Sequence, residues 1–566
     1  MKRPPSLVYA PEEVPPLHVT AFNAIQHVGL IAINLVYPLL VFRLVDAPLP
    51  LVSTLLAVGM IVLGAGTLLQ VLRLGPVGSG FLCPATFSAA YLSPSLLAAK
   101  AGGLPLVFGM TLFAGLLEVA LARALPRLRA VFPVELSGVV IFMIGVSGSA
   151  AGLRSLLSPD ASPMSPAEWW VAAFTLAVMV GLNVWGKGLL RMLCALIGLA
   201  AGYAAAAFAG LLGAVQVGGV GDLPWVALPG LGHLSWSYEW VMVVPFAIAC
   251  LAAAMKALGT ITVCQRMVDA DWVRPDMRSA TRGVLADGLS TALSGLLNAV
   301  GTNTSTPSVG LASATGVASR RVGVAVGLLF LALGLLPKLT TLLALMPRSV
   351  MVAALLFSIC FIIVNGLQVM TSRLLDSRRT LVIGLALVAG AAAEIFPVIA
   401  AHAGASWRPI VGSSLVFATL VGLVLNLLFR VGVKQTVTLG VEPGRVDARR
   451  IDDFLRTHGG KWGARPDVVG RAAFAANQLV EAVAENCWKG GPLTLQASFD
   501  EFNLDLRLSY RGEPLEFPER RPSEEEIRAT DEGVRRLAGF MLRQNADRIR
   551  SEALEGTATV HFHFDH

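Results

Sequence analysis

The sequence predicts an all-α polytopic membrane protein with fourteen membrane segments in a seven-plus-seven inverted repeat, followed by a small soluble α+β domain. Of the 566 residues, 55% are hydrophobic and 14% are charged, whereas about a quarter are charged in a typical soluble domain. A single globular core cannot bury so much apolar surface, because cores stop growing at about 250–300 residues. Near residue 435 the composition changes to that of a soluble protein. We therefore expect a tail over residues 1–20, a transmembrane domain over 21–434 and a soluble domain over 435–566.

Twelve apolar stretches are long enough for ordinary membrane helices, which need about 17–25 residues to cross the hydrocarbon layer. They cover residues 21–44, 50–72, 104–125, 131–153, 169–186, 189–214, 240–262, 280–300, 321–337, 347–366, 380–398 and 410–431.

Two further stretches, 78–98 and 302–318, are interrupted by Gly, Pro, Ser and Thr. They come third and tenth, so each is third in a group of seven. Two halves with an odd number of segments have opposite orientations in the membrane, as in transporters whose substrate lies between broken helices near the midplane. Irregular backbone is tolerated at that depth only where it is buried or lines a cavity. The alternative is a pair of glycine-rich kinks without a ligand.

The distribution of basic residues fixes the expected orientation. With the N-terminus in the cytoplasm, the inside loops carry most of the Lys and Arg residues, as the positive-inside rule requires. The outside loops carry only Arg43, Lys100, Arg154, Lys338, Arg348 and Arg408. We expect a multi-pass protein of the bacterial inner membrane with both termini in the cytoplasm. The net charge of +7 is spread over loops, which argues against a nucleic-acid partner.

Lys256 is a charged residue deep within an apolar segment. Intramembrane charges are costly and are functional candidates by default. The alternative is a lysine that extends to the interface, although about ten apolar residues precede it. Gln26, His27, Glu118 and Asp287 are further polar residues in apolar segments, and each either contacts a substrate or bridges helices.

The polar run 302–306 precedes Pro307, and proline favours the first turn of a helix. The free amides of that helix would favour negative charge. With Lys256 they predict a site for an anion or for a ring rich in carbonyl groups. We find no nucleophile motif, phosphate loop or Cys/His spacing for a metal, so we expect transport without catalysis, cofactor or metal.

The stretch GLLNAVGTNTSTPSVGLASATGVASR resembles the signature of the nucleobase–ascorbate transporters, the xanthine/uracil permeases. That signature runs Gln/Glu/Pro, Asn, any residue, Gly, four residues, Thr and Arg/Lys/Gly. It corresponds here to Pro307, Ser308, Gly310, Thr315 and Gly316. The pair Gln26-His27 is similar to the family's Gln-His motif, and the resemblance covers about three-quarters of the chain.

The resemblance implies a core and a gate domain, elevator-type alternating access, a homodimer, and symport of a purine, pyrimidine or ascorbate with H⁺ or Na⁺. The substrate would lie between the third, eighth and tenth segments. The residues implied are Lys256, Thr260, Phe87, Ser88, Ala89, Thr306, Pro307, Ser308, Gln26 and His27.

The chain departs from the family at the positions that matter most for binding. Lys256 stands where the family has a glutamate, Pro307 replaces the signature Gln or Glu, and Ser308 replaces Asn. The charge expected beside the substrate is therefore reversed, and the family's titrating carboxylate is missing at that place. We expect an anionic heterocycle or small organic anion rather than neutral uracil.

In the soluble domain, the patterns predict a strand and turn over 437–447, a helix over 467–487, a strand pair over 493–499 and 503–510, a helix over 523–545 and a last strand over 557–564. The run NQLVEAVAENCW faintly resembles the ATPase-like fold of anti-sigma factors and sensor kinases. Tyr510-Arg511-Gly512 stands where that fold has the Asp-x-Gly turn that recognises adenine, so the domain would be a degenerate form of the ATPase-like fold. The default is docking of a cytoplasmic regulatory protein. His561 and His563 share one face of the last strand.

Two other functions fit parts of the sequence. An organic or inorganic anion transporter of the sulfate-permease type would share the inverted repeat and the cytosolic C-terminal domain. In such a transporter Lys256 would favour the bound anion. A transporter-like sensor would signal through its C-terminal domain. Flux through vesicles that contain only this protein would exclude a pure sensor.

Overall fold

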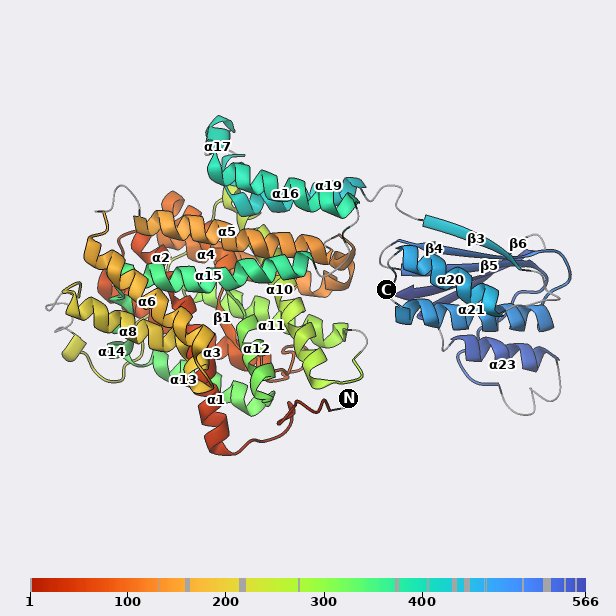
Figure 1. Ribbon diagram of the computed structural model, residues 1–566, viewed down its shortest axis with the longest axis horizontal. Helices are drawn as coiled ribbons and strands as arrows, with labels where there is room; N and C mark the ends of the chain where they lie inside the picture. Colours follow the sequence, from red (N-terminus) through yellow and green to blue (C-terminus); the bar gives the residue numbers. More distant parts are fainter. Residues whose placement is uncertain are drawn as a thin grey trace. The chain divides into compact units, whose positions relative to one another are not determined.

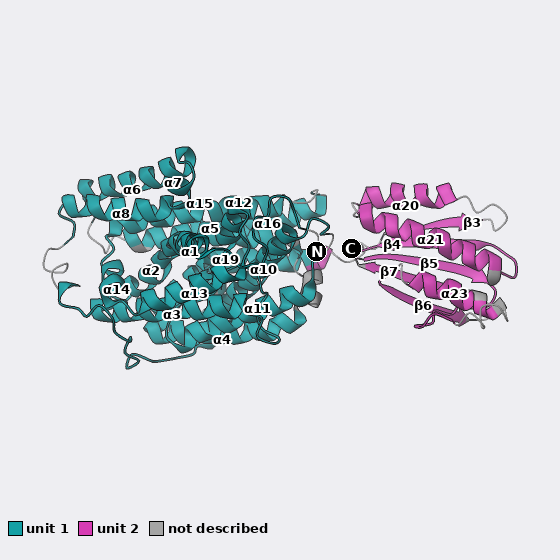
Figure 2. Cartoon of the chain, turned by 90° about the horizontal axis from the view of Figure 1, so that it is seen from below, with its two compact units in different colours: residues 1–426 teal, residues 427–566 magenta. Residues whose placement is uncertain are grey.

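The computed structural model has two compact units, residues Met1–Asn426 and Leu427–His566 (Figure 2). The structure describes residues 3–131, 133–157, 163–212, 220–272, 275–371, 375, 377–396, 398–404, 407–429, 435–441, 448–462, 464, 466–500, 503–522, 531–543, 546–554 and 557–565.

The first unit is almost entirely helical, which confirms the prediction of a helical membrane protein (Figure 1). Among the described residues, seven helical stretches are long and apolar enough to cross a membrane. The first is Leu17–Leu44, formed by α1 (Leu17–Ala32), η1 (Ile33–Leu35) and α2 (Val36–Leu44). The others are α3 (Leu49–Val71), Ala89–Ala124 within η2 (Ala89–Tyr91) and α4 (Leu92–Val131), Glu135–Arg154 within α5 (Val134–Leu157), α6 (Pro166–Trp185), Trp240–Val268 within η3 (Trp240–Met242) and α10 (Val243–Val268), and α15 (Arg348–Met370).

The remaining helices of this unit are shorter or less apolar. The bent pair α13 (Arg320–Gly334) and α14 (Pro337–Ala344), which meet at 82°, gives an eighth span if counted as one. The others are α7 (Leu189–Met192), α8 (Cys194–Phe208), α11 (Met277–Leu296), α12 (Thr306–Thr315), α16 (Ser377–Ile395), α17 (Val398–His402), α18 (Arg408–Val411) and α19 (Ser414–Phe429).

The two stretches predicted to be irregular are broken in the structure. The first contains the strand β1 (Ala85–Phe87), the short 3₁₀ helix η2 (Ala89–Tyr91) and the start of α4 (Leu92–Val131). The second contains the strand β2 (Thr302–Thr304) and α12. Within α4 the helix is interrupted at Gly102 and Gly103, and the φ of Gly103 is 70°, which favours glycine. One long element therefore forms two helices.

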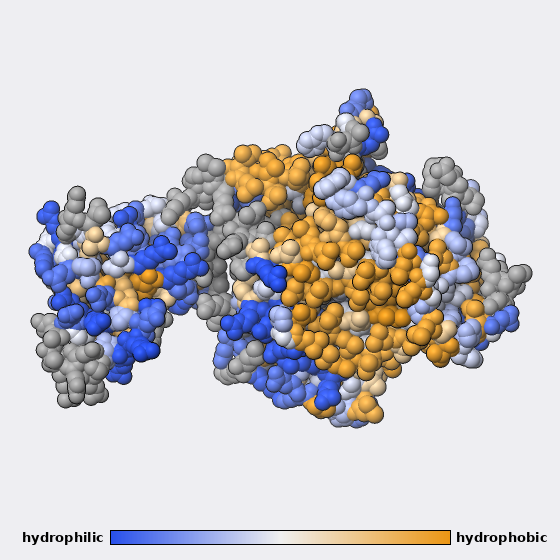
Figure 3. Space-filling view, turned by 180° about the vertical axis from the view of Figure 1, so that it is seen from behind, coloured by the Kyte–Doolittle hydropathy of each residue, from blue (hydrophilic) through white to orange (hydrophobic). Residues whose placement is uncertain are grey.

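Small residues allow close helix packing in this unit, as is common where the hydrophobic effect does not drive association. Helices α4 and α11 pack against each other along most of α11. A Cβ atom on Gly115 would lie 2.1 Å from the backbone nitrogen of Ala292, and one on Gly295 would lie 2.2 Å from that of Leu112. The visible outer surface of the unit is broadly hydrophobic (Figure 3), with exposed residues such as Trp170 and Phe208. Lipid tails are the natural neighbour of such a surface.

The second unit is a five-stranded antiparallel sheet with helices, in the strand order β3-β4-β5-β7-β6. Its elements are β3 (Gln435–Val441), α20 (Ala448–Trp462), α21 (Pro466–Asn486), β4 (Leu493–Phe499), β5 (Asn503–Arg511), α23 (Asp531–Arg543), β6 (Arg548–Leu554) and β7 (Thr557–Asp565). The predicted strand pair and the predicted helix from residue 467 are confirmed. Residues 442–447 of the predicted strand and turn, and residues 523–530, 544 and 545 of the predicted helix 523–545, lie outside the described residues. Helix α20 and strand β6 were not predicted.

Gly115→Val should disrupt the α4–α11 contact, because the new side chain would overlap the backbone of α11. Overpacking a well-packed interior costs about 1–3 kcal/mol. We expect a lower melting temperature of the detergent-purified protein, measured by intrinsic fluorescence. Gly384→Val on α16 is the matched control, because a Cβ there meets no atom within 4 Å. Equal melting temperatures for the two variants would contradict this account of the packing.

Candidate functional site

The two broken stretches meet in the interior of the first unit. Strands β1 and β2 pair antiparallel, with Ala85 opposite Thr304 and Phe87 opposite Thr302. The pairing continues beyond the strands, because Ser88 N donates to the carbonyl of Gly301 and Ser305 N donates to that of Pro84. All six strand residues are buried. Because buried backbone groups need partners, each break satisfies the polar groups of the other.

A helix begins directly after each strand. The side chain of Ser88 accepts a hydrogen bond from Ala90 N at the start of η2. The side chain of Ser305 accepts one from Ser308 N at the start of α12, where Pro307 occupies the first turn. Serine is a favoured N-cap because its hydroxyl accepts from an otherwise free amide. Pro307 is exposed, Thr306 is half-buried, and the buried Ser308 hydroxyl lies 2.9 Å from that of Ser305.

Helix α10 brings Lys256 and Thr260 to the start of α12. The Thr260 hydroxyl donates to the backbone carbonyl of Lys256 at 2.9 Å and lies 2.8 Å from the hydroxyl of Thr306. Lys256 is partly exposed. In the described part of the chain its ammonium group has no hydrogen-bond or ion-pair partner, although the charge of Asp287 acts on it. The hydrogen-bonding capacity of this ammonium group is therefore unused within the described residues.

Asp287 on α11 is the centre of a buried hydrogen-bond network. Its two carboxylate oxygens accept hydrogen bonds from the Asn303 amide at 3.0 Å and from the Thr304 hydroxyl at 2.8 Å. The same Asn303 amide donates to the carbonyl of Ala253 on α10 at 2.8 Å. The network joins β2, α10 and α11. From the sequence, Asp287 was only one of several polar candidates, and its contact with Asn303 was not predicted.

Glu118 on α4 lies beside Asp287 and is fully buried. Among the described residues, neither Glu118 oxygen meets a donor other than the neighbouring carboxyl group. Two adjacent carboxyl groups in a low-dielectric site disfavour a state in which both are charged. The arrangement can therefore hold a shared proton or a cation.

A second polar network connects β1 to α15. The side-chain Nδ2 of Asn34 in η1 donates to the Thr86 hydroxyl at 2.8 Å, and the Ser358 hydroxyl donates to the side-chain Oδ1 of Asn34 at 3.1 Å. The hydroxyl of Tyr37 lies 2.7 Å from that of Ser358. Asn34 was not predicted from the sequence, although an amide inside the first apolar stretch was a usable signal.

The other predicted residues lie nearby but make fewer contacts. Phe87 and Ala89 are buried, and η2 packs against α10. Gln26 and His27 are buried on α1, which packs against α12 and α13. Within the described chain, the polar atoms of both side chains have no hydrogen-bond partner. Among the predicted site residues that the structure describes, hydrogen bonds join Thr260 to the hydroxyl of Thr306 and to the backbone carbonyl of Lys256.

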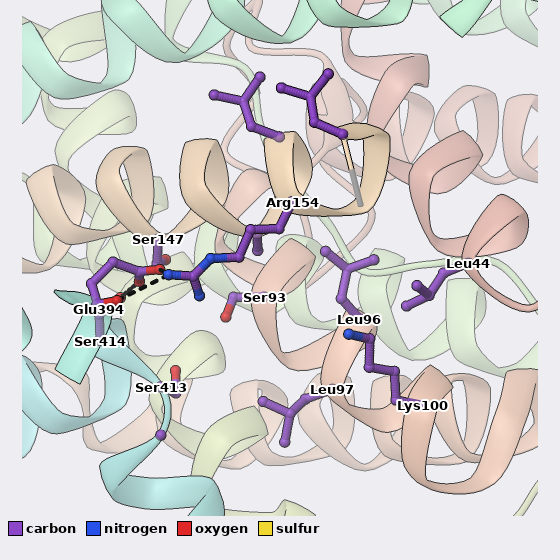
Figure 4. A pocket seen from close by; sticks show the side chains of 14 residues that line it. Leu44, Ser93, Leu96, Leu97, Lys100, Ser147, Arg154, Glu394, Ser413 and Ser414 are labelled. Carbon is purple, nitrogen blue, oxygen red and sulfur yellow. Dashed lines mark hydrogen bonds and ion pairs between the residues drawn. The ribbon is translucent and has the colours of Figure 1, made fainter. Parts of the chain in front are cut away.

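A cavity of about 600 Å³ lies among α4, α5 and the segment before α19. Arg154 forms an ion pair with Glu394 at 3.0 Å, and Ser414 donates to Glu394 at 2.7 Å. Lys100 and Ser93 on α4 face the same space (Figure 4). Lys100 and Arg154 were predicted to lie outside the membrane, and this cavity was not predicted from the sequence.

The sequence comparisons match mainly the first unit, and the matched proteins are permeases. A sequence model of the Permease family, of the xanthine/uracil type, matches residues 18–399. A xanthine permease of Escherichia coli K12 is 28% identical over 442 residues, which is 75% of this chain and 94% of that protein. A uric acid permease of Bacillus subtilis 168 is 27% identical over 430 residues, 73% of this chain and 93% of that protein.

Two solved structures are similar at lower identity. The transmembrane domain of the cyanobacterial bicarbonate transporter BicA has a TM-score of 0.42 and 14% identity, over 74% of this chain and 100% of that one. The murine anion transporter Slc26a9 has a TM-score of 0.46 and 11% identity, over 76% of this chain and 71% of that one.

Asp287→Leu should destabilise the protein, because it removes the acceptors of Asn303 and Thr304 while both stay buried. Each unsatisfied buried donor costs about 1–3 kcal/mol. We expect a clear fall in melting temperature, whereas Asp222→Leu in an exposed turn should leave it nearly unchanged. If the two variants melted together, the Asp287 network would not stabilise the site.

Proposed function

The chain belongs to the xanthine/uracil permease family, and from this premise we propose that it carries an anionic oxopurine such as urate or the xanthine anion. Its function is that of a nucleobase permease-type secondary transporter, not of an enzyme. The named relatives are xanthine and uric acid permeases, and both substrates are rings rich in carbonyl groups.

The observation that carries the proposed substrate is Lys256 on α10, one helical turn before Thr260, whose hydroxyl lies 2.8 Å from that of Thr306 at the start of α12. A free ammonium group and a helix N-terminus both favour negative charge. We assign the substrate to a site formed by Lys256, Thr260, Thr306 and Pro307, with residues 87–89 contributing from the paired strand and the residues after it. Gln26 and His27 are proposed to contact the substrate from α1, which is supported by their buried, unpartnered polar atoms.

We also propose the fourteen-segment inverted repeat, with elevator-type movement of a core against a gate. Three features support it: the matched strand-and-helix breaks, the antiparallel pairing of β1 with β2, and the division of α4 at Gly102 and Gly103. Coupling to H⁺ or Na⁺ is assigned to the Asp287–Glu118 pair, because this pair supplies the carboxylates that Lys256 does not. The expected homodimer, inner-membrane location and cytoplasmic termini belong to the same proposal.

Two observations bear on the alternative functions, which are an anion transporter of the sulfate-permease type and a pure sensor. The family match favours a nucleobase permease over the sulfate-permease type. The second unit begins at Leu427, after the family match ends at residue 399. Its proposed role is cytoplasmic and regulatory, through a partner protein or a ligand, and a pure sensor would show no flux.

Lys256→Gln should abolish most uptake of radiolabelled urate and xanthine into proteoliposomes, because a charge-assisted contact to the anion is lost. Hydrogen bonds to charged groups contribute about 1.5–3 kcal/mol, which corresponds to about tenfold or more in affinity. Lys187→Gln removes an exposed lysine and is the matched control. Unchanged urate uptake by Lys256→Gln would overturn the assigned role, and absence of uptake by the natural protein would favour the sensor.

A further inference from the structure

The sheet of the second unit has one apolar and one polar face. Strand pairing places Arg507, His561 and Arg550 side by side in one row across β5, β7 and β6. The next row on the same face contains Asp505, His563 and Arg548. We call Arg507, Arg548, Arg550, His561 and His563 the basic face.

The opposite face forms the core of the unit. Leu506, Leu508, Val560 and Phe562 are fully buried there and pack in one cluster with residues of α20, α21 and α23. Side chains alternate across a strand, so the residues of the basic face point away from this core. Their charges are therefore not required for burial of the apolar side.

The arginines of the basic face are available. Arg507, Arg548 and Arg550 are exposed, and in the described part of the chain none forms a hydrogen bond or ion pair. Two acids lie among them. Asp505 is engaged by His563, whose Nδ1 lies 2.7 Å from its Oδ1, and Glu552 borders the second hollow.

Two adjoining hollows lie on this face and share Arg507, His561 and His563. The first, of about 350 Å³, is also bordered by Thr436, Gln496 and Ser498, which add neutral hydrogen-bonding groups. The second, of about 390 Å³, is bordered by Arg548 and Arg550. Each volume suits a small ligand rather than a macromolecule.

The charged groups around His561 also act on its protonation. Burial is the largest cause that lowers the pKa of His561, and the positive charges of Arg507 and Arg550 lower it further. The negative charges of Glu552 and Asp505 act in the opposite direction and raise this pKa. A neutral imidazole keeps one N–H donor between the two guanidinium groups.

We propose that the basic face is a binding site for the phosphate group of a small phosphorylated molecule. Neighbouring strands are about 4.8 Å apart, so Arg507 and Arg550 flank His561 at a separation that two long side chains can close around one tetrahedral anion. Guanidinium groups match phosphate oxygens in bidentate geometry. A monocarboxylate would occupy only one of the arginines. The site is distinct from the membrane substrate site and would let a cytoplasmic metabolite act on the second unit.

The test is calorimetric titration of the full-length protein, in detergent, with sodium pyrophosphate. We expect one site in the natural protein and at least about tenfold weaker binding in Arg507→Gln/Arg550→Gln. The control is Arg456→Gln/Arg536→Gln, which removes the same charge from α20 and α23. Melting temperatures should be unchanged in both, because exposed substitutions rarely alter stability.

A second arm separates a soluble ligand from a lipid headgroup. The calorimetric titration would be repeated with phosphatidic acid or phosphatidylcholine carried in detergent micelles, for the natural protein and the two double variants. Loss of pyrophosphate binding only in the Arg507/Arg550 variant supports the proposal. No pyrophosphate binding, equal weakening by the control pair, or binding only to phosphatidic acid in micelles would overturn it.

Discussion

The first unit depends on the pairing of β1 with β2. A helix that breaks inside a bilayer exposes amide and carbonyl groups that no lipid can satisfy. This chain breaks two helices and pairs the broken ends, so Pro84, Gly301 and the hydroxyl-rich run after it are tolerated at depth. The pairing also fixes where the following helices start. Two helix starts are thereby held in one place, which no continuous helix could provide.

The same pairing organises the buried charges. Asn303 and Thr304 on β2 both donate to Asp287, and Asn303 also reaches α10. That arrangement occupies Asp287 with neutral donors and leaves Lys256 without a partner among the described residues. The resemblance to the family implies an acidic residue at the position of Lys256, and in this chain the charge of Asp287 acts on the lysine that stands there. The proposed preference for an anionic ring follows from this arrangement rather than from Lys256 alone.

Several features could be predicted because they are local. Alternation of apolar and polar residues predicted β4 and β5, and the charge of Lys256 in an apolar stretch marked it as a candidate. Contacts between distant segments could not be predicted in this way. The contacts of Asp287 with Asn303 and Glu118, and of Arg154 with Glu394, join residues on different helices and strands. They depend on tertiary packing, which the sequence next to each residue does not reveal. Strand β6 was missed because Arg548 and Arg550 alternate with few strongly apolar residues. Helix α20 was missed although Ile451 and Leu455 recur at helical spacing, and only Gly459-Gly460 near its end lowers the helix propensity.

The most direct test of the account is a cryo-electron microscopy structure of the protein with urate. The account predicts ligand density within hydrogen-bonding distance of Lys256 Nζ and beside Thr306 at the start of α12. Density confined to the cavity between Arg154 and Lys100, with none at Lys256, would contradict the claim that the paired breaks form the substrate site.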